Sequence, residues 1–393
     1  MKFEKLSFGI PREIMAAEKR VAVIPETVKK LTEQGARVVI ESGAGEDSFF
    51  MDEEYRKAGA EIARSTGEVY DNAEVFLKVK EPRFNEDLGK HEAELLPESS
   101  TLICFLHPAN PSNHGLVKQL AERNITSLSL DSIPRISRAQ KMDALTSMST
   151  IAGYKGAIWA SYYLSKFFPM MPTAFGMIPP AKVLVIGTGV AGLQSIATAK
   201  RLGGSVKAVD IRPEANEQAK SLGAEVIPFE VPEELAVGKG GYAQRLPEEW
   251  YFKEREFLSS YVQDSDVVIL TALIPGEEAP ILVDSDMISK MQKGSVIIDI
   301  SADQGGNCEL TRSGQEYYYQ GVFISGLLNI PATLPVHSTW MFAHNLWHFV
   351  DHLVTEGKID TSSEDEIIRE SLVTVGGKII HQGTLLAMEE AEE

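Results

Sequence analysis

Cysteine, long apolar runs and excess positive charge are all scarce in this sequence, and each shortage argues against a class of protein. Only Cys104 and Cys308 are present among 393 residues, which argues against a disulfide framework and favours a reducing compartment, the cytoplasm. The best candidate for a membrane span, residues 156–171, contains Lys166 and Pro169 and falls short of the roughly 20 apolar residues that a span needs. Acidic residues outnumber basic ones by 56 to 38, and the net charge of −18 repels nucleic acid and anionic lipid. We therefore expect neither a membrane span nor a nucleic-acid partner.

Apolar runs of strand length alternate with helix-length segments in two parts of the chain. Such alternation predicts an α/β protein with two doubly wound, Rossmann-like domains, whose mostly parallel sheets are joined by long helices. The long helices are expected over 142–168 and 338–355. We expect a discontinuous first domain over 1–140 and 338–393, and a second domain over 141–337. Strands of the first domain are predicted over 7–11, 36–42, 75–79, 102–106 and 126–130, and those of the second within KVLVIG, SVKAVDI, AEVIPF, DVVILT, SVIIDIS and VFISG.

The stretch VLVIGTGVAGLQ, residues 183–194, holds the most informative motif. A strand leads into Gly187-x-Gly189-x-x-Gly192 and then into a helix that begins near Val190. The first glycine permits a tight turn, the second lets the backbone approach a pyrophosphate, and the third lets helix and strand pack closely. The helix N-terminus adds unpaired N–H groups and partial positive charge for the phosphates. The second domain is therefore predicted to bind a dinucleotide.

An acidic residue at the end of the next strand indicates which dinucleotide. Asp210 lies 18 residues after Gly192. A carboxylate there accepts hydrogen bonds from the adenosine ribose and repels a 2′-phosphate, which favours NAD(H) over NADP(H). Ile211, the next residue, is also predicted to contact the cofactor. Arg212 has two interpretations, a solvated loop residue or a contact to a 2′-phosphate.

Two further segments are predicted at the same edge of the second sheet. Residues 237–250 contain three glycines and a tyrosine. They are predicted to form either a mobile loop that closes over the cofactor through Gly241 and Tyr242, or a plain surface connection. Residues 271–280 follow a strand and bring Leu273 to the carboxyl edge, where ligands of doubly wound folds bind.

The stretch RISRAQKMD, residues 135–143, has a structural and a functional interpretation. Ser137 and Gln140 fit the S-x-x-Q capping box at a helix start. Alternatively, Arg135, Gln140 and Asp143 together supply the donors and acceptors that bind a carboxamide, the group carried by a nicotinamide ring.

The segments PRISRAQKMDALTSMSTIAGYKGA, PPAKVLVIGTGVAGLQSIATAKRLG, GGYA and TALIPG resemble the NAD(H)-binding alpha subunit of proton-translocating NAD(P) transhydrogenase. The resemblance covers nearly the whole chain. It implies that Arg135, Gln140 and Asp143 surround the nicotinamide, and that Asp210 and Tyr242 contact the cofactor.

The same resemblance implies an activity and its partners. Hydride passes directly from NADH in this chain to NADP+ on a separate subunit, coupled to proton movement through membrane subunits. Transfer between two nicotinamide C4 atoms needs orientation at near contact and no acid or base on the carbon centre. The expected assembly contains a homodimer of this chain, a membrane subunit and an NADP(H)-binding subunit, and lies on the inner face of the cell membrane.

Alanine dehydrogenases share this overall fold, and four residues resemble their substrate site: Arg20 in EKRVAVIPE, Lys80 in KVKEP, His107 in FLHPAN and Asp303 in SADQGGN. The resemblance implies that they anchor a 2-oxo acid and move protons, as a histidine with a pKa near neutral can. NAD-dependent amino-acid dehydrogenation is therefore the alternative function. A nucleotide-sensing or subunit-interaction protein without turnover is a third possibility.

Three histidines recur every fourth residue in HNLWHFVDH, at His344, His348 and His352. Two histidines at this spacing can bind zinc. No cysteine or glutamate set accompanies them, so we expect a helix face at a subunit or domain contact and no metal.

Overall fold

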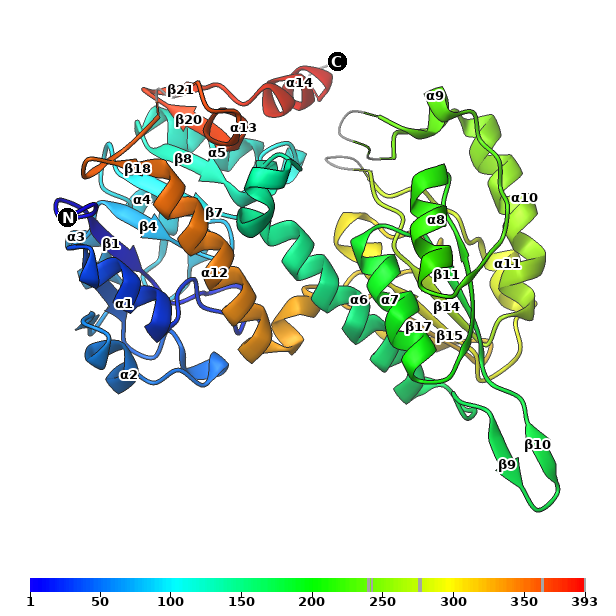
Figure 1. Cartoon of the computed structure of the whole chain (residues 1–393). Coiled ribbons are helices and arrows are strands. Elements are labelled where there is room, and N and C mark those ends of the chain that lie inside the picture. The colour runs from blue at the N-terminus through cyan, green and yellow to red at the C-terminus, as the bar shows by residue number, and fades with distance from the viewer. Residues whose placement is uncertain (239–240, 242, 275–277, 362–363, 392–393) are drawn as a thin grey trace. The chain divides into compact units, whose positions relative to one another are not determined.

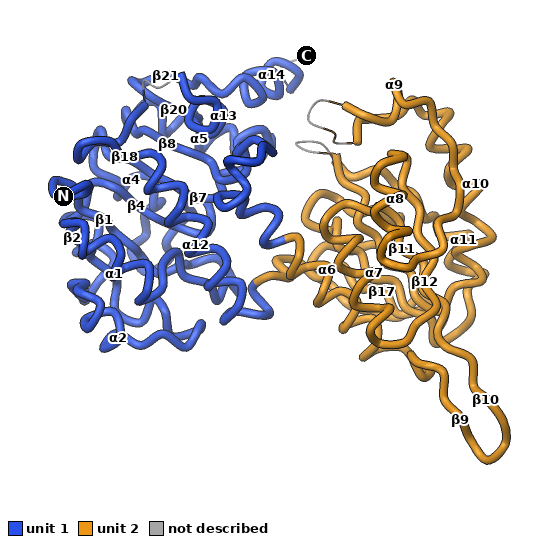
Figure 2. Tube along the Cα trace, in the orientation of Figure 1, with its two compact units in different colours: residues 1–148, 332–393 blue, residues 149–331 orange. Residues whose placement is uncertain are grey.

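The computed structural model describes residues 1–393 except 239–240, 242, 275–277, 362–363 and 392–393. The chain forms two compact units (Figure 2): unit 1 is residues 1–148 with 332–393, and unit 2 is residues 149–331. The sequence placed these boundaries at 140 and 338. Helix α6 (Ala144–Tyr163) begins in unit 1, and Ala157 and Ala160 on its later turns pack into the core of unit 2.

Unit 1 contains an eight-stranded sheet with the order β21-β20-β8-β7-β4-β1-β2-β3. All neighbours from β3 to β8 pair in parallel, whereas β20 pairs antiparallel with β8 and with β21. The elements of its N-terminal part are β1 (Ser7–Ile10), α1 (Pro25–Glu33), β2 (Arg37–Glu41), α2 (Asp52–Lys57), β3 (Glu61–Ala63), α3 (Thr66–Asp71), β4 (Val75–Leu77), β5 (Phe84–Asn85), β6 (Lys90–His91), α4 (Glu92–Leu95), β7 (Thr101–Cys104), α5 (His114–Glu122) and β8 (Thr126–Ser129).

The C-terminal segment of unit 1 completes this sheet. Its elements are α12 (Pro335–Leu353), β18 (Val354–Thr355), β19 (Lys358–Ile359), α13 (Glu366–Ser371), β20 (Leu372–Val375), β21 (Lys378–Ile379) and α14 (Gln382–Glu390). Thr374 of β20 donates to the carbonyl of Ile125 at 2.7 Å, and its hydroxyl lies 2.6 Å from that of Ser127. The helix predicted over 338–355 corresponds to α12. Strands β20 and β21 were not predicted from the sequence.

Unit 2 contains a seven-stranded sheet with the order β13-β12-β11-β14-β15-β17-β16. All pairs are parallel except β16 with β17. Strand order therefore reverses at β11, as in a doubly wound sheet. Its elements are β11 (Lys182–Ile186), α7 (Val190–Arg201), β12 (Ser205–Val209), α8 (Pro213–Ser221), β13 (Glu225–Val226), α9 (Glu233–Ala236), α10 (Glu248–Asp264), β14 (Val267–Leu270), α11 (Ser285–Ser289), β15 (Val296–Asp299), β16 (Glu316–Tyr319) and β17 (Val322–Ser325).

Helices cover both faces of the unit 2 sheet, which explains why its strands are continuous apolar runs. Every residue of β14 and β15 is buried. One core cluster packs against α10 through Leu258 and Val262, and the other packs against α6 and α7. A strand buried on both faces shows no polar alternation. The prediction of two doubly wound α/β domains is confirmed.

A two-stranded hairpin, β9 (Met171–Thr173) and β10 (Gly176–Ile178), projects from the body of unit 2 (Figure 1). The sequence had assigned the residues before it, up to 168, to the long helix, but α6 ends at Tyr163. Among the helices of the described residues, none is both long and apolar enough to cross a membrane.

Candidate functional site

The glycine loop between β11 and α7 has the geometry that the motif predicted. Gly187 has φ +86°, and a Cβ there would lie 2.8 Å from the backbone nitrogen of Ala272. A Cβ on Gly192 would lie 2.0 Å from the carbonyl oxygen of Gly187, so only glycine lets α7 pack this close to the turn. A Cβ on Gly189 would meet only an Arg212 nitrogen, 3.9 Å away. The first and third glycines are thus required by the fold, whereas the second leaves open space at the helix N-terminus.

Helix α7 begins at Val190 with Gly189 as its N-cap, and no side chain caps it. The N–H groups of its first turn and the partial positive charge of the helix end are therefore available to an anion. The open space at Gly189 lies at this same helix end, where a pyrophosphate would sit. The loop fits the phosphates of a dinucleotide.

Asp210, directly after β12, is 7% exposed, and its carboxylate is held by four hydrogen bonds. Thr188 N donates at 2.7 Å, Arg212 N and Nε donate at 2.9 Å each, and Arg212 Nη2 donates at 2.8 Å. Burial alone would lower the pKa of Arg212, but these bonds to Asp210 raise it. Arg212 is therefore not a solvated loop residue. It covers the carboxylate that a ribose would need, so ribose binding must compete with this ion pair.

Arg212 also reaches the glycine-rich segment. Its Nη1 donates to the carbonyl of Gly241 at 3.2 Å, and Val237 and Ala243 form a β-bridge around this segment. Tyr242, predicted as a cofactor contact, lies outside the described residues. The side chain of Ile211 packs on the core beside β12.

The loop after β14 is fixed to the loop after β15 by one buried amide. Asn307 Nδ2 donates to the carbonyls of Ala272 (2.8 Å) and Pro280 (2.9 Å), while its Oδ1 accepts from Ala272 N at 2.9 Å. Asn307 itself is held by Asp299, which accepts from its backbone N–H at 2.8 Å. Leu273, next to this clamp, is 38% exposed at the carboxyl edge of the sheet. Sequence reasoning missed Asn307, whose only signal was its place in the loop after a buried strand.

Glu254 on α10 is a second residue of unit 2 that the sequence did not single out. Its side chain is 4% exposed, and its pKa is raised to about 8, because burial strips water from the charged form and Asp210 repels it. The unit thus holds a carboxyl group that is protonated at neutral pH within electrostatic reach of Asp210.

The loop with Arg135, Gln140 and Asp143 forms a 3-10 helix, η4 (Ser137–Met142), in unit 1. Ile136 is its N-cap, with no side-chain hydrogen bond, so the predicted capping box of Ser137 and Gln140 is wrong. Asp143 caps the following helix instead, accepting from Thr146 N at 2.8 Å and Thr146 Oγ1 at 2.6 Å. Arg135 and Gln140 are exposed. Gln140 is therefore not committed to a capping role.

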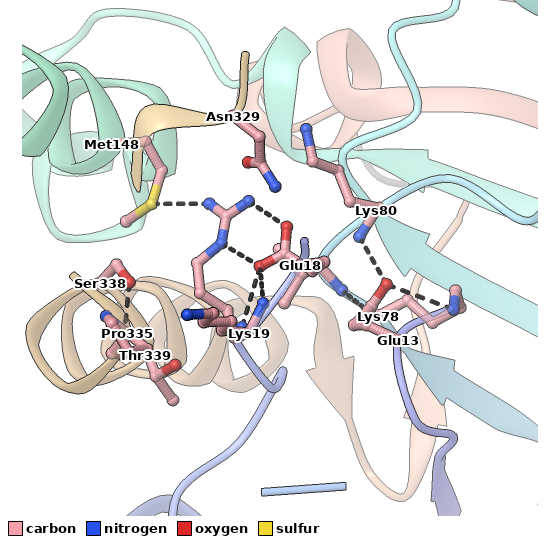
Figure 3. Close-up of polar contacts among 12 residues, drawn as sticks. Glu13, Glu18, Lys19, Lys78, Lys80, Met148, Asn329, Pro335, Ser338 and Thr339 are labelled. Carbon is pink, nitrogen blue, oxygen red and sulfur yellow. Dashed lines mark hydrogen bonds and ion pairs between the residues drawn. The ribbon is translucent and has the colours of Figure 1, made fainter. Parts of the chain in front are cut away.

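Three of the four dehydrogenase-like residues lie in unit 1, and the first of them is buried. Arg20 is 3% exposed and pairs with Glu18 (Figure 3): its Nε donates to Oε1 at 2.7 Å and its Nη2 to Oε2 at 2.5 Å. Its Nη1 lies 3.1 Å from the sulfur of Met148. The guanidinium that would anchor a substrate carboxylate already has a bidentate carboxylate partner.

Lys78 and Glu13, which Figure 3 labels, belong to a second buried charge cluster. Lys78, 1% exposed, contacts Glu92 at 2.9 Å and Glu13 at 3.4 Å. Burial raises the pKa of Glu13 to about 7, although Lys78 acts against the shift. Glu13 also accepts from the backbone N–H of Lys80 at 3.4 Å, and the Lys80 side chain is half-buried.

His107 has a carboxylate partner. Its Nδ1 lies 2.9 Å from Asp131 Oδ1, and its backbone N–H donates to Asp131 Oδ2 at 2.7 Å. Burial would lower the pKa of His107, but the Asp131 carboxylate outweighs it and the pKa is raised. The ring is 41% exposed, and its Nδ1 lies within ion-pair distance of the Asp131 carboxylate.

The fourth residue of this set, Asp303, is exposed in unit 2, where both its oxygens accept from Asn329 N at 3.4 Å. The set is therefore divided between the two units.

The three histidines of α12 are distributed over separate contacts. His344 Nε2 lies 3.5 Å from Glu26, and His352 Nε2 lies 3.3 Å from Asp365. Burial lowers the pKa of His348. Within the part of the chain that the structure describes, no three His, Cys, Asp or Glu side chains are grouped to hold a metal ion.

A doubly wound sheet, a glycine turn into an uncapped helix and a buried aspartate after the second strand define unit 2 as a dinucleotide-binding domain of the Rossmann type. The comparisons with known proteins agree. Residues 9–152 match the N-terminal domain of alanine dehydrogenase/PNT, and residues 156–382 match its C-terminal domain. The chain belongs to the alanine dehydrogenase/PNT family.

Both branches of that family occur among its relatives. The chain is 41% identical over 379 residues to the first part of NAD(P) transhydrogenase subunit alpha of Rhodospirillum rubrum, covering 96% of this chain and 98% of the relative. It is 30% identical over 387 residues to an alanine dehydrogenase of Methanococcus maripaludis, covering 96% and 95%. The solved transhydrogenase of Sinorhizobium meliloti has a TM-score of 0.82 at 37% identity, covering 95% of this chain and all of that one.

Proposed function

We propose that this chain is the NAD(H)-binding alpha subunit of an NAD(P) transhydrogenase and exchanges hydride between NADH and NADP+ held by a partner subunit. The observation that carries the proposal is the Gly189 and Asp210 geometry of unit 2, which suits an NAD-type dinucleotide. The high identity to transhydrogenase alpha subunits over the full chain supports the choice within the family.

The dinucleotide is held, on this proposal, by unit 2. Gly187, Gly189 and Gly192 form the turn, and the N–H groups of α7 from Val190 onward receive the pyrophosphate. Asp210 and Arg212 act as a pair at the ribose: the carboxylate accepts its hydroxyls, and the guanidinium moves aside to allow it. Ile211, Gly241, Tyr242 and Leu273 are the proposed remaining contacts.

The nicotinamide carboxamide is bound, on the same proposal, by Arg135, Gln140 and Asp143. An exposed guanidinium donates, a carboxamide side chain donates and accepts, and Asp143 retains acceptor capacity beyond its two bonds to Thr146. The bound cofactor supplies the hydride. The residues themselves need only fix the ring, because a near-attack geometry replaces acid–base chemistry in a transfer between two C4 atoms.

The alternative activity, NAD-dependent dehydrogenation of alanine or another amino acid, is favoured by one specific observation. His107 Nδ1 lies 2.9 Å from the Asp131 carboxylate, and the pKa of His107 is raised while its ring remains partly exposed. Against it stands the buried pairing of Arg20 with Glu18, which occupies the guanidinium proposed to anchor the carboxylate.

One pair of assays separates these activities. The purified chain is supplied with NADH, thio-NADP+ and the NADP(H)-binding and membrane subunits, and thio-NADPH is followed by its own absorbance. The chain alone is supplied with NAD+ and L-alanine. Hydride transfer in the first assay, without turnover in the second, supports the transhydrogenase function. Turnover in the second assay, without partner subunits, rejects that function. Binding of NADH without turnover in either assay points to a nonenzymatic role.

We propose further that the chain is a homodimer within that assembly, with the β9–β10 hairpin as its contact. Phe175 at the turn is fully exposed, and Met177 and Met170 are 61% and 54% exposed. Such an apolar projection is costly to leave in water and suits burial against a second copy. Phe175→Asp is expected to shift the sedimentation of the chain from dimer to monomer, whereas a wild-type chain that sediments as a monomer contradicts the proposal.

A further inference from the structure

The loop with Arg135, Gln140 and Asp143 is tied to the C-terminal segment of unit 1. Arg138, in the middle of η4, forms an ion pair with Asp365, 227 residues away in sequence. Asn345 on α12 donates from Nδ2 to the carbonyl of Lys141 at 2.9 Å, and α12 packs along η4. These contacts hold a short 3-10 turn that has no cap of its own.

Asp365 is the centre of this anchor. Its Oδ1 accepts from the backbone N–H of Ile367 at 2.8 Å and thereby caps α13, and it lies 3.3 Å from His352 Nε2 of α12. Its side chain is 22% exposed. One carboxylate thus joins η4, α12 and α13, and α13 in turn packs against the 3-10 turn η3 (Leu130–Ser132) that precedes the loop.

We propose that Asp365 is a positioning residue that fixes the loop carrying Arg135, Gln140 and Asp143 by holding Arg138. The proposal deepens the transhydrogenase function proposed above and rests on it for the catalytic consequence. Its physical basis is that Arg138 lies between Arg135 and Gln140, so a displacement of its backbone moves both side chains.

The anchor remains charged at every pH at which such an enzyme works. Burial would raise the pKa of Asp365, but the bonds from Arg138 and Ile367 and the proximity of His352 lower it to about 2. The carboxylate that pairs with Arg138 therefore keeps its negative charge at neutral pH. A misplacement of reacting groups by about 1 Å can cost roughly a hundredfold in rate, so even partial release of the loop has a measurable effect.

The test uses the full chain with two matched substitutions. Asp365→Asn removes the charge and keeps the capping ability of the side chain, since Asn is as good an N-cap as Asp. Glu370→Gln removes an exposed carboxylate of the same helix, which pairs with Arg369 at 3.2 Å. We measure amide hydrogen exchange over 130–143, the dissociation constant for NADH, the thermal midpoint, and kcat for thio-NADP+ reduction with the partner subunits.

Asp365→Asn is expected to accelerate exchange over 130–143 and to lower kcat about tenfold at an unchanged dissociation constant for NADH. Glu370→Gln should change none of these quantities. Arg138→Ala should match Asp365→Asn, and the double variant should be no worse than either, because both changes break one link. Should Asp365→Asn fail to fold, Arg138→Ala tests the link from the other side.

Unchanged exchange over 130–143 in both Asp365→Asn and Arg138→Ala overturns the anchor. Faster exchange with wild-type kcat overturns the positioning role. The exchange measurement needs no partner and no turnover, so a wild-type chain that transfers no hydride would refute the proposed function while the exchange data still decide whether Asp365 holds the loop.

Discussion

Replacing Gly189 by alanine separates the role of the glycine loop in binding from its role in folding. The new Cβ would meet only Arg212 Nη2, at 3.9 Å, and Gly189 has φ −69°, which alanine adopts readily. The free energy of unfolding should therefore stay the same or rise by about 0.4–1 kcal/mol, because alanine restricts the unfolded chain. On the proposed binding mode, the same Cβ would occupy the space that the pyrophosphate needs at the N-terminus of α7.

The loss of affinity can be estimated from the bonds that the Cβ would displace. A hydrogen bond from a backbone N–H to a charged group contributes about 1.5–3 kcal/mol, and about 1.4 kcal/mol is a tenfold change in the dissociation constant. Gly189→Ala should therefore weaken NADH binding about 10- to 100-fold. Fluorescence titration with NADH and urea unfolding of the same preparation measure the two quantities.

Gly192→Ala is the matched control, because it changes the same loop but should lower the stability of the fold through a steric clash. Its Cβ would lie 2.0 Å from the Gly187 carbonyl oxygen, far inside van der Waals contact, so the helix or the glycine turn must shift to make room. Overpacking of this kind costs about 1–3 kcal/mol of stability. Tight NADH binding by Gly189→Ala, or a loss of stability equal to that of Gly192→Ala, would refute our account of the loop.

Three further outcomes follow from other parts of the two units. Asp210→Asn should reduce the preference for NADH over NADPH at least about tenfold in fluorescence titrations, because the charge that repels a 2′-phosphate is removed and Arg212 is released to bind it. Arg135→Ala should lower hydride transfer to thio-NADP+ about a hundredfold while NADH binding is kept, whereas His107→Ala should leave that rate unchanged; a dead His107 variant would contradict the assignment of the reaction. Glu254→Gln should become increasingly more stable than wild type as the pH rises, as measured by urea unfolding.

The fold was predictable where the local sequence pattern and the packing of the whole domain favour the same conformation. Gly187 must be glycine because its φ is positive, and Gly192 because a Cβ there would lie 2.0 Å from the Gly187 carbonyl oxygen. These two requirements are visible in the sequence as the spacing of the glycines. Strands such as β14 and β15 are visible because burial on both faces excludes polar residues. β20 escaped prediction because it is a short run after an acidic segment, and its place in the sheet depends on pairing with β8.

The site was less predictable where side-chain partners decide it. The pattern at Ser137 and Gln140 matches a capping box, but Asp143 caps the helix from a few residues further on, and a local pattern does not reveal which cap prevails. The role of Arg212 was ambiguous because its bidentate bond to Asp210 depends on the side-chain rotamer of Arg212, which the sequence does not indicate. The ion pair of Arg138 with Asp365 joins segments 227 residues apart, and no spacing rule could indicate it.

The pH dependence expected at Glu254 has a definite sign. Its pKa is about 8 in the folded chain against an ordinary 4.5, because burial and then Asp210 disfavour its charge. Between these values the folded chain keeps a proton that the unfolded chain has released, so the free energy of unfolding falls as the pH rises from about 4.5 to about 8. Glutamine carries no charge and escapes this loss. The stability of Glu254→Gln relative to wild type should therefore grow by on the order of 4 kcal/mol between about pH 5 and pH 9. Glu256→Gln, an exposed change on the same helix, should show a constant difference. A Glu254→Gln profile parallel to that of wild type would mean that the buried carboxyl group is ionised throughout.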